Sequence, residues 1–177
     1  MEDIIAVIRT LNEMEREGVV ERYAIGGAVG ATFYLEPAAT IDVDVFVPLT
    51  STVGSTIVSL DAVIGYLTGR GFEMNREYFM IGGWPVQFLP SSPGLIDEAL
   101  EQAEEFDLGA EIVARVFKPM HLAAMALQTG RNKDKLRLVQ FRDAGLLPVD
   151  EFEAILSRYG LVEKWAAFER QFPRNSE

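Results

Sequence analysis

Cysteine is absent from the 177 residues of the chain, and histidine occurs once, as His121. Without cysteine the chain can form no disulfide, no zinc–thiolate site and no thiol nucleophile. One histidine cannot build a metal centre of several imidazole ligands. Catalytic or metal-binding chemistry must therefore use carboxylate, amide, hydroxyl or basic side chains.

Long apolar segments are also missing. No apolar run in the sequence reaches the ~18 residues that a membrane span needs. The first residues, Met1-Glu2-Asp3, lack the basic start of a signal peptide. We therefore expect a soluble, cytoplasmic protein with no membrane partner.

Basic residues are few. The chain has 16 Lys and Arg against 27 Asp and Glu, which gives a formal net charge of −11. Because neutralising nucleic-acid phosphates requires Lys and Arg, we expect no broad nucleic-acid-binding surface. A small local basic site stays open as an alternative.

The remaining composition is typical of a globular protein, with 49% hydrophobic and 24% charged residues. These proportions exclude intrinsic disorder and collagen-like repeats. A chain of this length buries roughly 70% of its unfolded surface, so it needs no metal or disulfide to fold. We expect one compact unit of the α/β (α+β) class, with an α/β core over residues 1–92 and a mostly helical C-terminal part over residues 93–177 packed on it.

Hydrophobic periodicity predicts the order of the secondary structure. Apolar residues spaced three and four apart predict helices over residues 4–14, 28–35, 60–69, 95–106, 119–129, 133–144, 149–159 and 161–172. Alternating or β-branched runs bounded by Gly and Pro predict strands over residues 23–25, 41–47, 78–81, 84–89 and 112–117. Ser59 is expected to cap the helix that follows it.

The strand over residues 41–47 carries the most informative motif. Side chains alternate along a strand, so Asp42 and Asp44 point to one face and their aliphatic neighbours to the other. Two carboxylates about 7 Å apart on one face repel each other, and partial burial would strengthen that repulsion. A divalent cation, Mg²⁺ or Mn²⁺, would offset it because hard oxygen ligands suit such ions. The alternative is an edge strand whose polar face is simply exposed to water.

Gly26-Gly27 lies fifteen residues before the first aspartate, where a predicted strand turns into a helix. Glycine lets the backbone approach a phosphate, and the N–H groups at the start of a helix attract an anion. A plain turn would use the same residues. The dinucleotide-binding pattern G-x-G-x-x-G and the P-loop pattern with Gly-Lys-Ser/Thr are both absent, so neither of those nucleotide sites is expected.

The basic residues are unevenly placed. Five of the sixteen fall within twelve positions, namely Arg131, Lys133, Lys135, Arg137 and Arg142. In so acidic a chain this cluster is a candidate anion site, and an exposed helix start is the alternative. The acidic residues between 97 and 111 are interpreted as a solvated helix face.

Together these segments resemble a known superfamily. Gly26-Gly27, a helix and then Thr40-Ile41-Asp42-Val43-Asp44 resemble the DNA polymerase β-type nucleotidyltransferases, and most closely their small toxin-type, abortive-infection-like bacterial and archaeal members. The segment from Leu127 to Asp134 resembles the basic segment that follows a later helix in those proteins. The resemblance implies a nucleotidyltransferase-like mixed β-sheet flanked by helices, and it leaves open whether the protein belongs to a toxin–antitoxin pair.

The resemblance also implies an activity. The expected reaction is transfer of a nucleoside monophosphate from an NTP to an unknown hydroxyl acceptor on a protein, an RNA or a small molecule, with Mg²⁺ (or Mn²⁺) as cofactor. The matching residues are the catalytic, metal-binding Asp42 and Asp44, the phosphate-binding Gly26 and Gly27, and the nucleotide-binding Arg131 and Lys133. The two basic side chains would neutralise the triphosphate.

Three positions depart from the pattern of the active members. The third acid, on a neighbouring strand, is replaced by Gln87, whose amide cannot accept a proton from an attacking hydroxyl. A lysine in the helix before the basic segment is replaced by Ala124-Met125-Ala126. A basic residue before Thr40 is replaced by Ala38-Ala39.

Some residues are candidates for accessory roles. Thr40 could orient Asp42 by a hydrogen bond, and Asp134 or Glu77 could substitute for the missing acid. If neither acid does so, the alternative function is a catalytically degenerate protein that binds a nucleotide or a partner protein without turnover. A partner protein with no ligand at all is a third reading.

Overall fold

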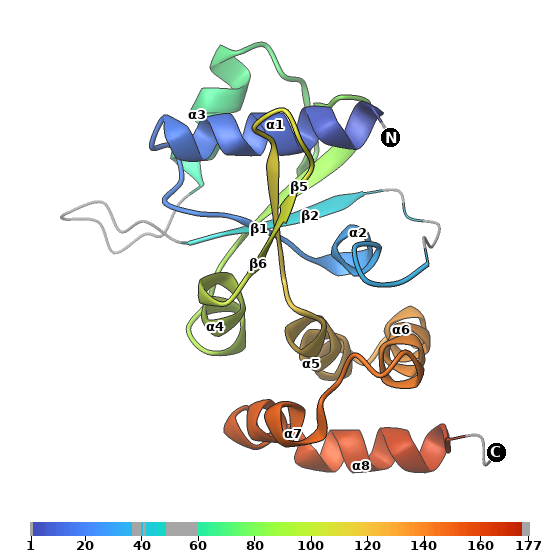
Figure 1. The fold of residues 1–177 in the computed structure, drawn as a ribbon. Helices are drawn as coiled ribbons and strands as arrows, with labels where there is room; N and C mark the ends of the chain where they lie inside the picture. The colour runs from blue at the N-terminus through green and yellow to red at the C-terminus, as the bar shows by residue number, and fades with distance from the viewer. Residues whose placement is uncertain (1, 37–39, 41, 49–59, 175–177) are drawn as a thin grey trace.

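The computed structural model describes residues 2–36, 40, 42–48 and 60–174, and these form a mixed β-sheet flanked by helices (Figure 1). Within the described residues the sheet has seven strands in the order β3-β4-β5-β2-β1-β7-β6. The strands are β1 (Ala24–Ile25), β2 (Val43–Val47), β3 (Met74–Asn75), β4 (Tyr78–Ile81), β5 (Trp84–Pro90), β6 (Glu104–Asp107) and β7 (Val113–Val116). β2 is parallel to β5 and β1 is parallel to β7, whereas the other neighbouring pairs are antiparallel. The expected mixed α/β sheet is confirmed.

The helices of the described residues follow the predicted order. They are α1 (Glu2–Arg16), α2 (Gly27–Ala31), α3 (Asp61–Gly69), α4 (Leu95–Glu101), α5 (Pro119–Thr129), α6 (Asn132–Asp143), α7 (Val149–Arg158) and α8 (Val162–Gln171). Among them no helix is both long and apolar enough to cross a membrane.

Helix α1 covers one face of the sheet and contacts β4, β5 and β7 (Figure 1). Val43, Val45 and Val47 of β2 are buried in the same apolar cluster as Ile8 and Leu11 of α1. Full burial of each such side chain contributes about 1.5–3 kcal/mol. Because side chains alternate along a strand, this packing turns the intervening residues of β2 to the opposite face.

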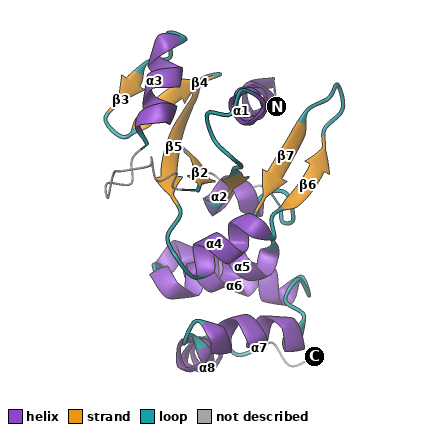
Figure 2. Cartoon of the chain, turned by 90° about the vertical axis from the view of Figure 1, so that its left-hand side faces the viewer, coloured by secondary structure: helices purple, strands orange, loops and turns teal. Residues whose placement is uncertain are grey.

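Helices α4 to α8 gather at one end of the sheet, away from α1 and α3 (Figure 2). Helix α5 is central to this group, since it contacts α2, α4, α6, α7 and α8. Its side chains His121, Leu122, Ala123, Ala124, Ala126 and Leu127 are buried. The contact of α5 with α2 brings the following helix, α6, close to the glycine turn and to β2.

The predicted helix over residues 95–106 is wrong in its second half. Helix α4 ends at Glu101, and Glu104–Asp107 forms β6, paired antiparallel with β7. Phe106 packs in this strand with its ring centroid 5.0 Å from that of Phe33 and 5.4 Å from that of Tyr34. Long-range pairing and aromatic packing therefore override the local helical pattern.

Other bounds also differ from the prediction. Helix α2 ends at Ala31 rather than at residue 35, because the chain turns there with hydrogen bonds that span only three residues at Thr32, Phe33 and Tyr34. The short strand β3 was not predicted. The predicted cap Ser59 and the strand residue Ile41 lie outside the described residues, as does Ala38-Ala39.

Strands β6 and β7 come from the second half of the chain and complete the sheet next to β1. Two buried apolar clusters are present, one between the sheet and α1 and α3, and one among α4 to α8. The division into parts at residue 92 stays a prediction.

Candidate active site

Asp42 and Asp44 line one cavity of about 580 Å³, which we call the aspartate cavity. Asp44 is half-buried within β2, and Asp42 is half-buried just before that strand. Their placement follows from the packing of the valines of β2 against α1, which leaves the polar positions facing away from that core. The remaining walls of the aspartate cavity are Gly27, Ala28, Thr40, Tyr78, Gln87, Arg131, Lys133, Leu136, Arg137 and Gln140.

A row of polar side chains crosses the sheet at Asp44. The register of the parallel pair β2–β5 places Gln87 beside Asp44, and the antiparallel pair β4–β5 places Tyr78 beside Gln87. All three residues line the aspartate cavity. Gln87 therefore lies beside Asp44 on the neighbouring strand, where the resemblance predicts that glutamine replaces the third acid.

The glycine turn lies directly against the aspartate strand. The backbone N–H of Gly26 donates a hydrogen bond of 2.9 Å to the carbonyl oxygen of Asp44. Gly27 has a φ of +58° and begins α2, and a Cβ atom built on it would lie 2.0 Å from Oδ2 of Asp44. Only glycine fits this position, both in conformation and in space. Gly27 lines the aspartate cavity, whereas Gly26 does not line it and packs against the rings of Phe46 and Phe117.

Thr40 lies next to Asp42 in the cavity wall. Its hydroxyl donates to the backbone carbonyl of Asp42 at 3.2 Å and approaches Oδ1 of the same residue at 3.5 Å. These contacts restrict the segment that enters β2. The predicted orienting role for Thr40 agrees with this geometry, although the carboxylate contact is at the limit of hydrogen-bond length.

Cationic side chains from the start of α6 face the two aspartates. Arg131 and Lys133 are exposed, while the side chain of Arg137 is only 15% exposed. All three line the aspartate cavity. Arg137 belongs to the basic cluster of the sequence but is not among the predicted site residues. Its spacing of four from Lys133 on a helix, which puts both on one face, is the signal that would have found it.

Asp134 holds the arginines in place. It is 2% exposed and accepts hydrogen bonds from Nε of Arg131 at 2.7 Å and from Nη2 of Arg131 at 3.3 Å. Nη1 of Arg137 lies 3.8 Å from its Oδ1. A carboxylate enclosed by two guanidinium groups is committed to those contacts. The hypothesis that Asp134 substitutes for the missing acid therefore has little geometric support.

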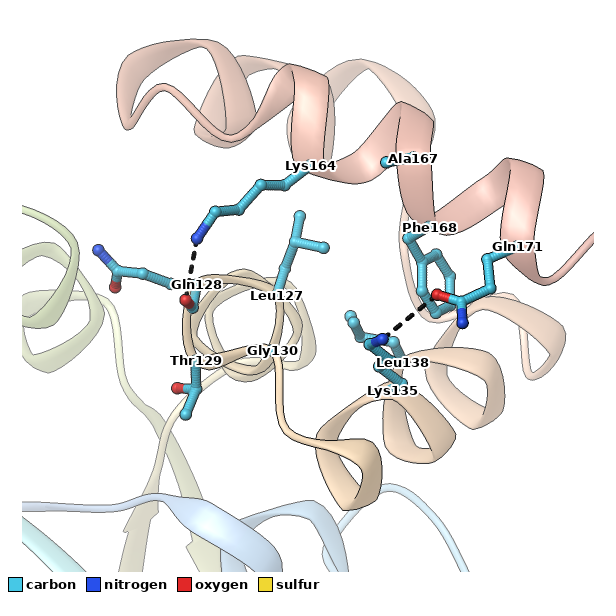
Figure 3. Close-up of a pocket in the computed structure, with 10 residues that line it drawn as sticks. All are labelled: Leu127, Gln128, Thr129, Gly130, Lys135, Leu138, Lys164, Ala167, Phe168 and Gln171. Atoms are coloured by element: carbon cyan, nitrogen blue, oxygen red, sulfur yellow. Dashed lines mark hydrogen bonds between the residues drawn. The ribbon is translucent and has the colours of Figure 1, made fainter.

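The rest of the basic cluster points elsewhere. Lys135 donates to Oε1 of Gln171 at 3.3 Å and lines a separate cavity of about 230 Å³ between α5, α6 and α8 (Figure 3). On another wall of that cavity, Lys164 donates to the carbonyl oxygen of Gln128 at 3.1 Å. Arg142 is buried, and its Nη1 donates to the carbonyl oxygen of Phe172. Three members of the basic cluster thus line the aspartate cavity, and the other two, Lys135 and Arg142, contact the end of the helical part.

The surroundings of Asp44 in the aspartate cavity disfavour its ionised form. Burial, and then the negative charge of Asp42, raise the pKa of Asp44 above its ordinary value. Lys133, Arg131 and Arg137 oppose this increase. Burial lowers the pKa of Arg137, and burial together with the nearby carboxylates raises the pKa of Tyr78. A cation between the two aspartates would relieve this unfavourable interaction.

The aspartate pair fits a hard divalent cation with an incomplete protein ligand set. Among the described residues, no group of three or more His, Asp or Glu side chains could hold a metal ion. Mg²⁺ is commonly bound by one or two carboxylates with the remaining positions filled by water and substrate phosphates. Asp42 and Asp44 are therefore the residues that would hold Mg²⁺ or Mn²⁺, and a phosphate-bearing substrate would complete the site.

A second cavity, of about 340 Å³, adjoins the aspartate cavity. The two share five wall residues, namely Gly27, Asp44, Gln87, Arg131 and Arg137. Beyond this shared wall, the second cavity is lined mainly by apolar side chains of β2, β5, α4 and α5. They are Phe46, Leu89, Ile96, Leu122, Met125 and Ala126. We call it the apolar-walled cavity.

Two other titratable groups lie away from both cavities. His121 is fully buried, and its Nε2 lies 3.2 Å from Oε1 of Glu98, whose other oxygen accepts from Arg158 and Tyr159. This network joins α4, α5 and α7. Glu77 is exposed in the turn before β4 and does not line the aspartate cavity, so its predicted substitution for the missing acid stays a prediction.

Comparisons with known proteins bear on the fold. The chain matches no protein-family model, and no curated protein matches it significantly. A similar solved structure is that of the antibiotic-resistance factor ANT(2'')-Ia, an aminoglycoside nucleotidyltransferase determined in solution. The two chains are 15% identical, the match covers 94% of this chain and 95% of the other, and the TM-score is 0.52. The chain therefore has a nucleotidyltransferase-like fold.

Proposed function

We propose that the protein is a nucleotidyltransferase that transfers a nucleoside monophosphate from an NTP to an acceptor and releases pyrophosphate. One observation carries the proposal: in a nucleotidyltransferase-like fold, a single cavity combines two neighbouring aspartates with three cationic side chains. Opposed acidic and basic walls suit a metal–triphosphate substrate, because the aspartates bind the cation and the basic residues bind phosphate oxygens. At about 580 Å³ the aspartate cavity is within the usual size range of ligand sites.

Each wall of the aspartate cavity has a distinct task in this reaction. Asp42 and Asp44 hold Mg²⁺ or Mn²⁺, and the bound cation neutralises phosphate charge. Thr40 restrains the chain at Asp42. Gly27 lets the carboxylate of Asp44 lie against the backbone at the start of α2, because a Cβ at this residue would lie 2.0 Å from Oδ2 of Asp44. Arg131 and Lys133 compensate the charge that develops on the leaving pyrophosphate.

The bonds that change are those of the α-phosphorus. An acceptor oxygen forms a new bond to it, and the bond to the oxygen that bridges the α- and β-phosphates breaks. The electron pair of the broken bond leaves with pyrophosphate. Positioning and charge neutralisation account for most of the catalysis in phosphoryl transfer, and the cavity supplies both.

The toxin-type likeness and a toxin–antitoxin role stay predictions from sequence. The hydroxyl acceptor implied by the resemblance stays a prediction as well. A hydroxyl would need a base for its proton, and the neighbouring-strand position that would hold that base is Gln87. The same observation favours a second candidate function, a degenerate protein that binds an NTP without turnover.

Two measurements on the purified protein test the proposal. The first is thermal unfolding with each NTP and Mg²⁺, where a ligand at 100 times its Kd adds about 2.7 kcal/mol of stability. The second is transfer of label from α-labelled NTPs to the components of a cell lysate. Stabilisation and transfer that both disappear in Asp42→Asn and Asp44→Asn would support the enzyme. Stabilisation without transfer would identify the degenerate binder. If the protein shows neither stabilisation nor transfer, both candidate functions are refuted.

A further inference from the structure

A hydroxyl acceptor must lose its proton during transfer, so the cavities can be searched for a group to receive it. Four described residues that line the two cavities have side chains that ionise as acids, namely Asp42, Asp44, Asp134 and Tyr78. The internal segments outside the described residues, 37–39, 41 and 49–59, contain no Asp, Glu or His in the sequence. These four side chains are therefore the candidate proton acceptors.

None of the four is free to act as a base. Asp42 and Asp44 hold the cation in the proposed function, and a carboxylate bound to a metal is a poor proton acceptor. Asp134 is enclosed by Arg131 and Arg137. A phenol such as that of Tyr78 ordinarily ionises only near pH 10, so it is protonated at neutral pH.

The residue beside Asp44 is not a proton acceptor either. Gln87 lies next to Asp44 in register, on the wall shared by both cavities. Its amide can donate and accept hydrogen bonds but cannot take up a proton at neutral pH. The reaction would proceed without a base if the acceptor oxygen were already ionised.

We propose that the acceptor is a phosphate monoester, held by Arg137 at the shared wall with its organic group in the apolar-walled cavity. This inference rests on the proposed function and names the acceptor class for the same site. It departs from a hydroxyl acceptor.

Arg137 fits an anionic acceptor by position and by chemistry. It lines both cavities, which places it where the NTP and the acceptor must meet. Among the described residues, the polar contact of Arg137 is the 3.8 Å ion pair with Asp134, so most of its N–H donors are available. A guanidinium group presents several donors in a planar arrangement that matches phosphate oxygens.

The apolar-walled cavity suits the organic part of the acceptor. Its apolar wall is formed by Phe46, Leu89, Ile96, Leu122 and Met125, and the carboxylates that it contains are Asp44 and the paired Asp134. Such a wall would bind an aromatic or aliphatic group by burying apolar surface. It offers no free carboxylate to a polycation.

The reaction balances without proton transfer from the acceptor. A phosphate monoester is mostly a dianion at pH 7, because its second ionisation occurs near pH 6. One of its oxygens forms a bond to the α-phosphorus of the NTP, and the bond from that phosphorus to the α,β-bridging oxygen breaks. The products are a diphosphate that links the nucleoside to the organic group and a pyrophosphate that carries the electron pair of the broken bond.

The experiment compares matched acceptors with α-labelled NTPs and Mg²⁺. Phenyl phosphate is paired with benzyl alcohol, glycerol 3-phosphate with glycerol, and benzoate tests a carboxylate. We expect a nucleoside diphosphate ester from the phosphate of each pair, formed at least roughly 100-fold faster than any alcohol product, since that is the contribution of a missing general base. Transfer to alcohols or to benzoate in preference to the phosphates would overturn the proposal.

A pH series separates an ionised acceptor from a protein base. With phenyl phosphate the rate should rise with the second ionisation of that compound and then level off. With phenylphosphonate, whose second ionisation occurs at higher pH, the rise should move to higher pH by the same interval. A rise that stays at one pH for both acceptors would reveal a protein base and overturn the proposal.

Two substitutions complete the test. Gln87→Glu keeps the size of the side chain and restores an acid, so it should increase transfer to benzyl alcohol relative to phenyl phosphate. Arg137→Gln should weaken binding of phenyl phosphate, measured by calorimetry without Mg²⁺, by roughly 10-fold or more. Lys135→Gln removes a charge from the same helix outside both cavities and is the matched control.

The binding measurement also distinguishes the two proposals. If Arg137→Gln and Lys135→Gln bind phenyl phosphate equally, while NTP binding still depends on Asp42 and Asp44, the acceptor assignment fails and the proposed function stands. If NTP binding is independent of the aspartates, the proposed function fails first.

Discussion

Asp44 and Gln87 lie side by side on the parallel strands β2 and β5, in the wall shared by two cavities. A carboxylate and an amide thus face the same space. The carboxylate can take up a proton, whereas the amide cannot do so at neutral pH. The carboxylate can bind a cation, while the amide can only orient a ligand by hydrogen bonds. In the proposed function this pair supplies cation binding but no general base, so the acceptor oxygen must already be ionised.

Replacing Asp44 should separate stability from function. Its ionised form is disfavoured in the folded protein, because burial and Asp42 raise its pKa, and stability from this group is therefore lost as pH rises. Asp44→Asn should raise the melting temperature at pH 8 without metal, measured by calorimetry. It should also abolish stabilisation by NTP with Mg²⁺ and reduce transfer by at least roughly 100-fold. A lower melting temperature together with unchanged NTP binding would contradict both expectations.

Replacing Gly27 should disturb the position of Asp44. A Cβ at this residue would lie 2.0 Å from Oδ2 of Asp44, and the φ of +58° adds backbone strain. We expect Gly27→Ala to cost about 1–3 kcal/mol in chemical denaturation and to weaken NTP binding. Gly71→Ala is the control, because Gly71 has a similar φ of +84° with open space around it. Equal losses of NTP binding in both variants would exclude a direct effect on Asp44.

Removing the charge of Asp134 should release the two arginines. Asp134 is 2% exposed and bonds Arg131 at 2.7 Å, so Asp134→Asn leaves a buried polar site with weaker partners. We expect a loss of about 1–3 kcal/mol in unfolding free energy and weaker NTP binding. Glu153→Gln, at an exposed position of α7, should change neither quantity measurably. NTP binding that survives the Asp134 substitution unchanged would show that the arginines do not depend on it.

The Glu98 network should make stability depend on acidic pH. Burial alone would raise the pKa of Glu98, but hydrogen bonds from Tyr159, Arg158 and His121 lower it to about 2. A carboxyl with a lowered pKa stabilises the fold above its unfolded pKa, and this contribution disappears as pH falls through the folded value. The wild-type advantage in unfolding free energy over Glu98→Gln should therefore shrink as pH falls from about 4.5 to 2, as measured by urea denaturation. An advantage that does not change over this range would contradict the network.

Local patterns predicted much of the fold, because most elements bury a face that the sequence already marks. The valines of β2 and the apolar residues of α5 give a clear period, and both elements form as predicted. Strand β6 did not follow its pattern, since its conformation depends on pairing with β7 and on the rings that meet Phe106. Such long-range contacts are not encoded in a local period.

The candidate site was predictable only in part, for a similar reason. The positions of the aspartates and of the glycine turn follow from local sequence features. These features are the alternation of side chains along β2 and the sharp bend before α2. Arg137 enters the aspartate cavity because α5 packs on α2 and places α6 there, whereas the two arginine contacts of Asp134 are pairs three residues apart that the helix itself brings together. Which members of a basic cluster face a cavity depends on the orientation of the whole helix, and the sequence does not specify that orientation.

The outermost strand of the sheet explains where some of the negative charge resides. Strand β6 ends the strand order beyond β7, and three of its four residues are acidic. Glu104 accepts a hydrogen bond from Tyr34, and Glu105 pairs with Arg115, so their side chains are anchored along the open border. Within the described residues β6 is an edge strand, and carboxylates on such an edge repel the same edge of another molecule. We therefore expect the acidic residues of β6 to disfavour strand-to-strand aggregation at this edge.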